Sequence, residues 1–148
     1  MPWERGIRRL NCLNATLVDV SLLAALNQQL QIDESHRLRM EIPELERRIT
    51  GWLLDEGYEA ALFEQDGETA GYALFRREPD FVYLKQFFIC RQFRRQGLGR
   101  QAVEWLLRHK WHNEPRVRLD VLVNNERGVA FWRAVGFQDY CLTMERQP

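Results

Sequence analysis

The sequence carries no net charge, no long apolar run and few cysteines. Its 148 residues include 21 lysines and arginines against 21 aspartates and glutamates, so the formal net charge is zero. The molecule as a whole therefore has no electrostatic attraction to nucleic acid or to an anionic membrane. The most apolar stretch, residues 17–26, is too short to span a bilayer, and polar side chains interrupt it. The first twelve residues lack the apolar run of a signal peptide.

The three cysteines, Cys12, Cys90 and Cys141, do not form a recognisable set. Their number is odd and their spacing is not that of metal ligands, so we expect reduced thiols, no metal and a cytoplasmic location. Repeats, low-complexity tracts and linker-like stretches are also missing. With 45% hydrophobic and 28% charged residues, the composition is typical of a globular protein, and we expect a single domain over residues 1–148.

Hydrophobic periodicity and turn residues predict a mixture of strands and helices. Strands are expected at residues 7–11, 58–63, 69–75, 81–90, 117–123, 137–140 and 142–145, and helices at residues 16–32, 43–57, 97–110 and 126–135. Asp66-Gly67 favours a tight turn between two of the strands, and Pro43 suits the first turn of a helix. This order predicts an α/β fold in which a central mixed β-sheet is flanked by about four helices.

The most informative segment is the loop that follows the apolar strand at residues 81–90. It runs Arg94-Arg95-Gln96-Gly97-Leu98-Gly99-Arg100 and opens a predicted helix. A helix N-terminus presents unpaired N–H groups and partial positive charge, and glycine lets a phosphate approach the backbone. Four arginines, at positions 91, 94, 95 and 100, lie here without an acid between residues 81 and 101. The segment favours an anionic ligand, although a solvated basic turn whose glycines fit helix against sheet has the same pattern.

Two blocks of the sequence resemble one known family. Arg94-x-x-Gly97-x-Gly99 after a strand resembles the Q/R-x-x-G-x-G/A signature of the GNAT superfamily of N-acetyltransferases. Residues 119–137 are similar to that family's L-E-V…N-x-x-A…Y-x-x-x-G-F block, and the separation of the two blocks also agrees. The resemblance covers nearly the whole chain. It implies a GNAT-like fold and transfer of an acetyl group from acetyl-CoA to a primary amine of a small molecule or protein.

The resemblance also implies which residues hold acetyl-CoA. Backbone N–H groups of the loop would bind the pyrophosphate, and the end of the preceding strand would pair with the pantetheine arm. Asn125 would lie beside that arm, and it can at the same time be the N-cap of the following helix. The implied cofactor-binding residues are Phe88, Ile89, Cys90, Arg94, Arg95, Gln96, Gly97, Leu98, Gly99, Arg100, Asn125 and Trp132.

The catalytic groups depart from the family pattern in two places. Trp132 stands where the family often has the tyrosine that protonates the departing thiolate, and an indole N–H is not a usable proton donor. Some members carry a glutamate base on the strand before the loop, but Tyr83 occupies the matching position and no acid occurs at residues 81–90. The candidate catalytic residues are therefore Asp120, Tyr140, Glu34 and His36.

An acidic segment between the first two helices suggests the kind of acceptor. Asp33, Glu34 and Glu41 would form a wall that favours a cationic amine, as a small molecule or a basic peptide. Two other functions stay open, a non-catalytic acyl-CoA sensor of the same fold and an RNA-binding surface on residues 91–108. Zero net charge and the lack of an RNA-module signature count against the RNA surface. The sequence also leaves a homodimer open.

Overall fold

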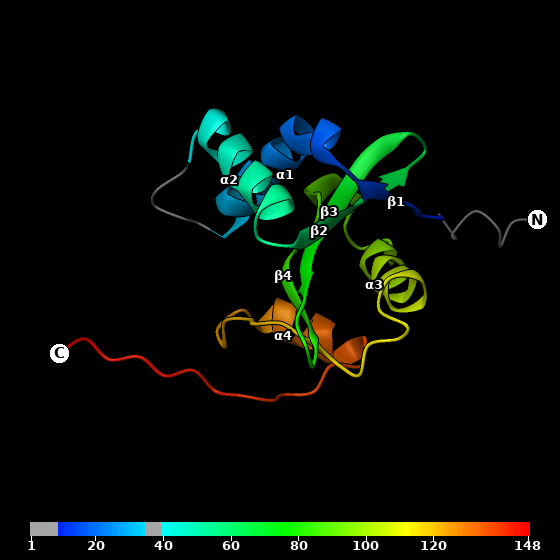
Figure 1. Cartoon of the computed structure of the whole chain (residues 1–148). Helices are drawn as coiled ribbons and strands as arrows, with labels where there is room; N and C mark the ends of the chain where they lie inside the picture. Colours follow the sequence, from blue (N-terminus) through cyan, green and yellow to red (C-terminus); the bar gives the residue numbers. More distant parts are fainter. Residues whose placement is uncertain (1–8, 35–39) are drawn as a thin grey trace, which may run out of the picture.

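The computed structural model of the chain describes residues 9–34 and 40–148, whose arrangement is shown in Figure 1. Five strands form one sheet in the order β1-β2-β3-β4-β5. They are β1 (Asn11–Ala15), β2 (Tyr58–Gln65), β3 (Glu68–Arg77), β4 (Val82–Ile89) and β5 (Val117–Arg118). The first four strands pair antiparallel with their neighbours, whereas β5 joins β4 in parallel. The predicted mixed sheet is confirmed.

Helices in the described part of the chain cover both faces of this sheet. They are α1 (Val20–Asp33), α2 (Ile42–Leu54), α3 (Leu98–His109) and α4 (Glu126–Ala134), with short 3₁₀ helices η2 (Leu17–Asp19) and η3 (Arg91–Phe93). α1 and α2 pack together on one face, where Leu23 and Leu45 are buried in the same core as Tyr72 of β3. α3 packs on the other face, where Leu106 shares a second core with Phe75. None of these helices is long and apolar enough to cross a membrane.

Two boundaries near the N-terminus were predicted wrongly. The first strand was expected at residues 7–11, whereas β1 spans Asn11–Ala15 within the described residues. The helix expected at residues 16–32 begins with the 3₁₀ turn η2 before α1. The Thr16 hydroxyl accepts from the Val18 N–H, and the Asp19 carboxylate accepts from the Thr16 N–H at 2.8 Å. This capping box tightens the first turn, because both side chains satisfy N–H groups that lack helical partners.

The two strands predicted at residues 137–140 and 142–145 were also wrong, and so was most of the strand predicted at residues 117–123. β5 has only two residues, and no described strand lies beyond it. Tyr140, Leu142 and Met144 alternate as they would in a strand, but they are exposed, and in Figure 1 the C-terminal segment runs away from the sheet. Alternating residues form a stable strand only beside another strand and over an apolar face.

The β3–β4 pairing depends on Gly71, which lies opposite Ile89. A Cβ at Gly71 would lie 2.0 Å from the Phe88 carbonyl oxygen. We therefore expect Gly71→Ala to lower the free energy of unfolding by about 3 kcal/mol, because either strand must shift to relieve the collision. Gly51 in α2 is the control, since its nearest neighbour beyond the helix is 4.0 Å away. Gly51→Ala should raise stability by about 0.5–1 kcal/mol in the same urea titration, and equal stabilities of the two variants would contradict this packing.

Candidate functional site

β4 loses its strand partner on one side partway along its length. β5 pairs with β4 only at Val82↔Val117 and Tyr83↔Arg118. From there to Ile89, β3 continues to cover one edge of β4, while no strand among residues 9–34 and 40–148 covers the other edge. Backbone N–H and C=O groups on the uncovered edge need water or a ligand as partners. We call this edge of β4 the open edge.

The direction of the free backbone groups follows from strand alternation. The Cys90 N–H donates to a β3 carbonyl at 2.7 Å, so Cys90 and, two residues earlier, Phe88 face β3. Ile89 and Phe87 therefore turn their N–H and C=O groups toward the open edge. The Ile89 carbonyl fits this direction, because it accepts from Arg94 Nε at 2.8 Å. Ile89 is thus the residue of the predicted stretch 88–90 whose N–H is available to a ligand.

The loop after β4 adopts a left-handed conformation where α3 begins. Arg95 has φ of 62° and Gly97, the N-cap of α3, has φ of 74°. Left-handed residues in such a turn direct successive N–H groups toward one point, which suits an anion, and the helix dipole adds to this. No atom of residues 9–34 and 40–148 lies within 4 Å of the Cβ position of Gly97 outside its own neighbours in the chain, so these residues leave the space in front of it open. The side chain of Leu98 is buried in the hydrophobic core and fixes the start of α3 to it.

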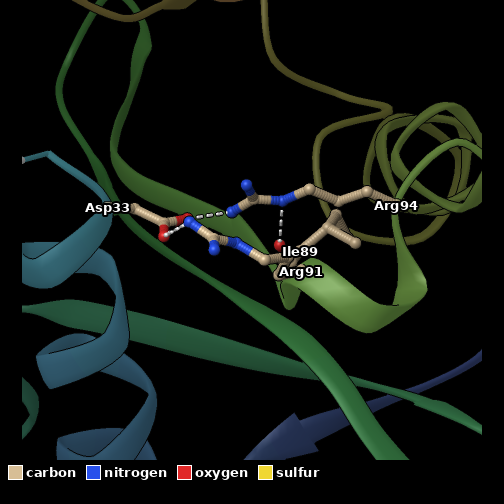
Figure 2. A network of polar contacts seen from close by, with 4 residues as sticks. All are labelled: Asp33, Ile89, Arg91 and Arg94. Carbon is tan, nitrogen blue, oxygen red and sulfur yellow. Dashed lines mark hydrogen bonds and ion pairs between the residues drawn. The ribbon is translucent and has the colours of Figure 1, made fainter.

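Two arginines of the predicted anion site bind a carboxylate of the protein itself. Asp33, the last residue of α1, lies between the guanidinium groups of Arg91 and Arg94 (Figure 2). Arg94 also donates to the Ile89 carbonyl, so one side chain links the end of α1, the end of β4 and the loop. This pairing weakens the prediction of an acidic wall, because two arginines balance the charge of Asp33.

The other two arginines of the segment differ in their surroundings. Arg100 donates to the Ala134 carbonyl at 3.1 Å, at the C-terminal end of α4, where a cation offsets the helix dipole. Arg95 is exposed and makes no side-chain hydrogen bond or ion pair with the described residues. Only Arg95 is therefore free to meet an anion with its side chain. An anion at this segment would therefore meet mainly backbone N–H groups, and fewer of the four arginines than the sequence suggests.

An aromatic cluster lies beside the open edge on the α3 face of the sheet. Phe87 stacks on Phe131 with ring centroids 5.9 Å apart and meets Trp132 edge-on at 5.1 Å. A Cβ at Gly99 would lie 3.1 Å from the Phe131 ring. Gly99 thus has the packing role that the sequence left open for the glycines. Trp132, a predicted cofactor residue, contacts the side chain of Phe87, whose backbone faces the open edge.

Asn125 acts as the N-cap of α4. Its side-chain oxygen accepts a hydrogen bond from the Gly128 N–H at 3.0 Å. A Cβ at Gly128 would lie 2.4 Å from the Asn125 amide nitrogen, so the cap needs glycine at this position. The predicted capping role is confirmed, and a contact of Asn125 with the cofactor stays a prediction.

Asp120 and Tyr140, two predicted catalytic candidates, lie near the point where β5 leaves β4. The Tyr83 hydroxyl donates to Asp120 at 2.8 Å. A carboxylate from the segment after β5 thus reaches the strand position at which the expected glutamate is missing. Burial and this hydrogen bond raise the pKa of Tyr83 to about 12, so its phenol stays protonated at neutral pH. Tyr140 accepts from Arg118 at 3.0 Å and is otherwise exposed.

The sequence analysis missed a buried polar network between α1 and the sheet. Asn27 donates to the Tyr72 hydroxyl at 3.0 Å and to Gln86 at 2.7 Å, and Tyr72 donates to Gln86 at 2.8 Å. Burial raises the pKa of Tyr72 above its ordinary value, and the charge of the predicted candidate Glu34 contributes in the same direction. His36, the last candidate, lies outside the described residues. The available signal was Asn27 itself, a polar residue on the apolar side of α1.

Comparison with known proteins agrees with this geometry. Residues 24–137 match the model of the acetyltransferase (GNAT) family, a stretch that includes the open edge, the loop, most of α1 and all of α2, α3 and α4. The chain belongs to the GNAT acetyltransferase family. It is 28% identical over 142 residues to the N-alpha-acetyltransferase of Sulfurisphaera tokodaii, covering 85% of this chain and 78% of that protein.

Two further proteins show how widely the GNAT family varies. The spermine/spermidine N(1)-acetyltransferase of Bacillus subtilis is 25% identical over 83 residues, which is 49% of this chain and 55% of that protein. The chain thus matches about half the length of that relative. The structure of a predicted acetyltransferase with acetyl-CoA from Clostridium acetobutylicum superposes with a TM-score of 0.73 at 20% identity, covering 94% of this chain and 96% of that one. At this identity the superposition shows the shared fold.

Two thiols of this GNAT protein, those of Cys12 and Cys90, are poorly suited to nucleophilic catalysis. Burial raises the pKa of Cys12 to about 11 and also raises that of Cys90. Both therefore stay protonated at neutral pH, and a thiol is a much weaker nucleophile than a thiolate. Within the described ranges, no group of three or more histidine, cysteine, aspartate or glutamate side chains is arranged to hold a metal.

The left-handed conformation of Arg95 can be tested by stability. A β-branched residue is strongly disfavoured at φ of 62°, whereas glycine adopts it without strain. We expect Arg95→Gly to be more stable than Arg95→Val by about 1–2 kcal/mol in urea denaturation, since the exposed side chain has no hydrogen bond or ion pair with the described residues to lose. Equal stability of the two variants would mean that the loop does not hold this conformation in solution.

The Tyr83–Asp120 contact predicts a specific alkaline response. A phenol whose pKa is raised on folding stabilises the protein below about pH 10 and loses that contribution as pH rises to about 12. Wild type should therefore lose stability relative to Tyr83→Phe across this window, measured by urea denaturation at several pH values. Tyr72 titrates late in both proteins and cancels in the difference. Parallel pH profiles would show that Tyr83 is not perturbed.

Proposed function

We propose that this GNAT protein transfers an acetyl group from acetyl-CoA to a primary amine of a small molecule or protein. The observation that carries the proposal is the continuity of two binding elements. The open edge of β4 ends at Ile89, and the left-handed loop with the N-terminus of α3 follows directly. The first element suits a chain of amide groups, and the second suits a phosphate. Acetyl-CoA combines both features in one molecule.

The residues present fit this co-substrate. Free N–H groups around Gly97 and the Arg95 side chain would hold the phosphates, in the space that a Cβ at Gly97 would enter. Ile89 and Phe87 would pair their backbone groups with the pantetheine amides. The aromatic cluster of Phe87, Phe131 and Trp132 would exclude water from one side of the arm. When bound, acetyl-CoA supplies an acetyl group that is activated as a thioester.

The chain's own groups would supply the remaining chemistry. The reaction forms an N–C bond, breaks a C–S bond and removes a proton from the amine. The Phe87 N–H, which lies farther along the open edge from the loop than Ile89, would polarise the thioester carbonyl. Asp120 is the proposed base, and the hydrogen bond from Tyr83 would fix its orientation. An ordinary thiol has a pKa of about 8.5. The thiolate of CoA can therefore leave without a dedicated acid at the Trp132 position.

A non-catalytic acyl-CoA sensor is the second candidate. It is favoured by Trp132 at the position of the usual acid and by the lack of a carboxylate on β4 itself. The Tyr83–Asp120 hydrogen bond weighs against it, because a carboxylate from the neighbouring segment can take the missing role. A cytoplasmic location and a homodimer stay predictions for either function.

Binding and turnover separate the two candidates. Wild type should bind acetyl-CoA at micromolar concentration in calorimetry and transfer a labelled acetyl group to members of an amine panel. Gly97→Glu should abolish binding, because it puts bulk and negative charge into the phosphate position. Asp120→Asn should bind acetyl-CoA normally but lower kcat/KM by about 10²-fold or more.

Asp139→Asn is the matched control for the base, since Asp139 is a carboxylate paired with Arg133 in the segment after α4. It should keep full activity. Binding without transfer to any amine would favour the sensor. Absence of acetyl-CoA binding by wild type would overturn both functions.

A further inference from the structure

A β-bulge in β4 brings two successive side chains to the same face of the sheet. The register runs Leu74↔Gln86 and then Phe75↔Leu84, which leaves Lys85 as the extra residue. The Lys85 ammonium lies over the ring of Trp52 in α2, and the Gln86 side chain binds Asn27 in α1. Both side chains therefore lie on the face that α1 and α2 cover. They come directly before the part of the open edge where the acetyl group would be held.

Lys85 is a half-buried cation without an anionic partner. Its ammonium lies 5.3 Å from the ring centre of Trp52 and 5.7 Å from that of Tyr58. Both rings are more than nine-tenths buried. No carboxylate among the described residues comes within ion-pair distance of Lys85. Aromatic rings compensate a cation only in part, so an anion beside Lys85 would complete its environment.

The same aromatic pair holds two further cations. The Arg48 guanidinium lies 4.6 Å from the Trp52 ring centre and makes its one described polar contact with a methionine sulfur, a weak acceptor. The Arg76 guanidinium lies 4.8 Å from the Tyr58 ring centre, but Glu78 neutralises it at 2.6 Å. Two of the three cations on the Trp52–Tyr58 pair therefore have no carboxylate partner in the described part of the chain, and both belong to the face at which an acceptor would approach β4.

Gln86 adds a hydrogen-bond donor of fixed direction. Its oxygen accepts from Asn27 and from the Tyr72 hydroxyl, at 2.7 Å and 2.8 Å, which uses both lone pairs of the oxygen. These two donors fix the amide so that Nε2 points away from them, and Nε2 has no partner among the residues the structure describes. Gln86 thus offers N–H groups and no acceptor atom to an incoming molecule.

We propose that the acceptor of this enzyme is an amine that also carries a carboxylate, bound by Lys85 with Gln86 Nε2 as a second donor. A carboxylate accepts from both groups at once, and a polyamine would meet only like charge and donors there. The proposed acceptor therefore carries a carboxylate for Lys85 and Gln86 and an amine that receives the acetyl group. Free amino acids combine these two groups. The inference rests on the proposed acetyl transfer and names its substrate class.

The test compares α-amino acids with their carboxamides, in which a neutral group of nearly the same size and shape replaces the carboxylate. We expect kcat/KM for acetyl transfer to favour the acids by at least about 10-fold, the usual effect of a charged hydrogen bond. Lys85→Met should reduce this ratio to about 1 without changing acetyl-CoA affinity. Lys110→Met is the control, because Lys110 is the only other lysine of the chain and lies after α3, and it should keep the wild-type ratio.

A second variant reverses the sign of the site. Gln86→Glu can still accept from Asn27 and Tyr72 but offers no N–H group, and it adds a negative charge beside Lys85. This variant should therefore prefer carboxamides over the corresponding amino acids, and a diamine such as cadaverine over lysine. A separate part of the test compares acetyl transfer to phosphoethanolamine with acetyl transfer to ethanolamine. Use of the phosphorylated amine with no preference for carboxylates would mean that the site binds phosphate and that the carboxylate assignment is wrong.

A readout without turnover keeps this inference apart from the proposed function. Calorimetry of the CoA-saturated protein should show N-acetylated amino acids binding more tightly than their carboxamides, by a factor that Lys85→Met removes. If acetyl-CoA binds and no amine is acetylated, the enzymatic function fails while this titration still decides the carboxylate site. Equal binding of acids and amides, or equal turnover, would overturn the inference and leave acetyl transfer intact.

Discussion

The site depends on one constraint, the hydrogen bonds that β4 leaves unmade after Tyr83. A strand in the middle of a sheet normally has both edges paired, and free N–H and C=O groups must find other partners. In this protein β5 pairs with β4 over two residues only. Among the described strands, the rest of β4 therefore has a partner on one side and an unpaired edge on the other. The loop and α3 follow at the end of that edge. A ligand with its own amide groups resolves the constraint, which is why binding can rest on the main chain.

The side chains around the open edge are arranged to keep it available. On the α3 face, Phe87, Phe131 and Trp132 form an apolar layer, and Gly99 leaves room for it. At the loop end, Arg94 binds the Ile89 carbonyl and Asp33, so the C-terminal end of α1 is linked to the loop after β4. The sequence analysis assigned the charge of Arg94 to a ligand, but in the structure this side chain fixes the positions of three elements. Arginine suits that task, because its planar group can serve several acceptors at once.

The sequence was sufficient for the elements that depend on local pattern. The strands β2, β3 and β4, α2 with its Pro43, the glycine loop and the Asn125 cap are all set by residues close in the chain. It was insufficient where long-range pairing decides. The C-terminal segment has the alternation of a strand but no neighbour to pair with, and the pairing of Tyr83 with Asp120 depends on the β4–β5 register. Counting arginines also misled, since Asp33, 61 residues from Arg94 in sequence, takes up part of their charge.

The acceptor face shows why local composition cannot give the sign of a binding site. Asp33, Glu34 and Glu41 are close in sequence and look like an acidic wall, but folding turns Asp33 toward two arginines. Lys85 is isolated among apolar residues in the sequence, yet the bulge at β4 brings it to the rings of Trp52 and Tyr58, which come from other elements. The electrostatic character of the face is set by which charges stay unpaired after folding. The acidic segment and the unpaired Lys85 therefore favour different classes of acceptor, and the comparison of amino acids with their carboxamides decides between them.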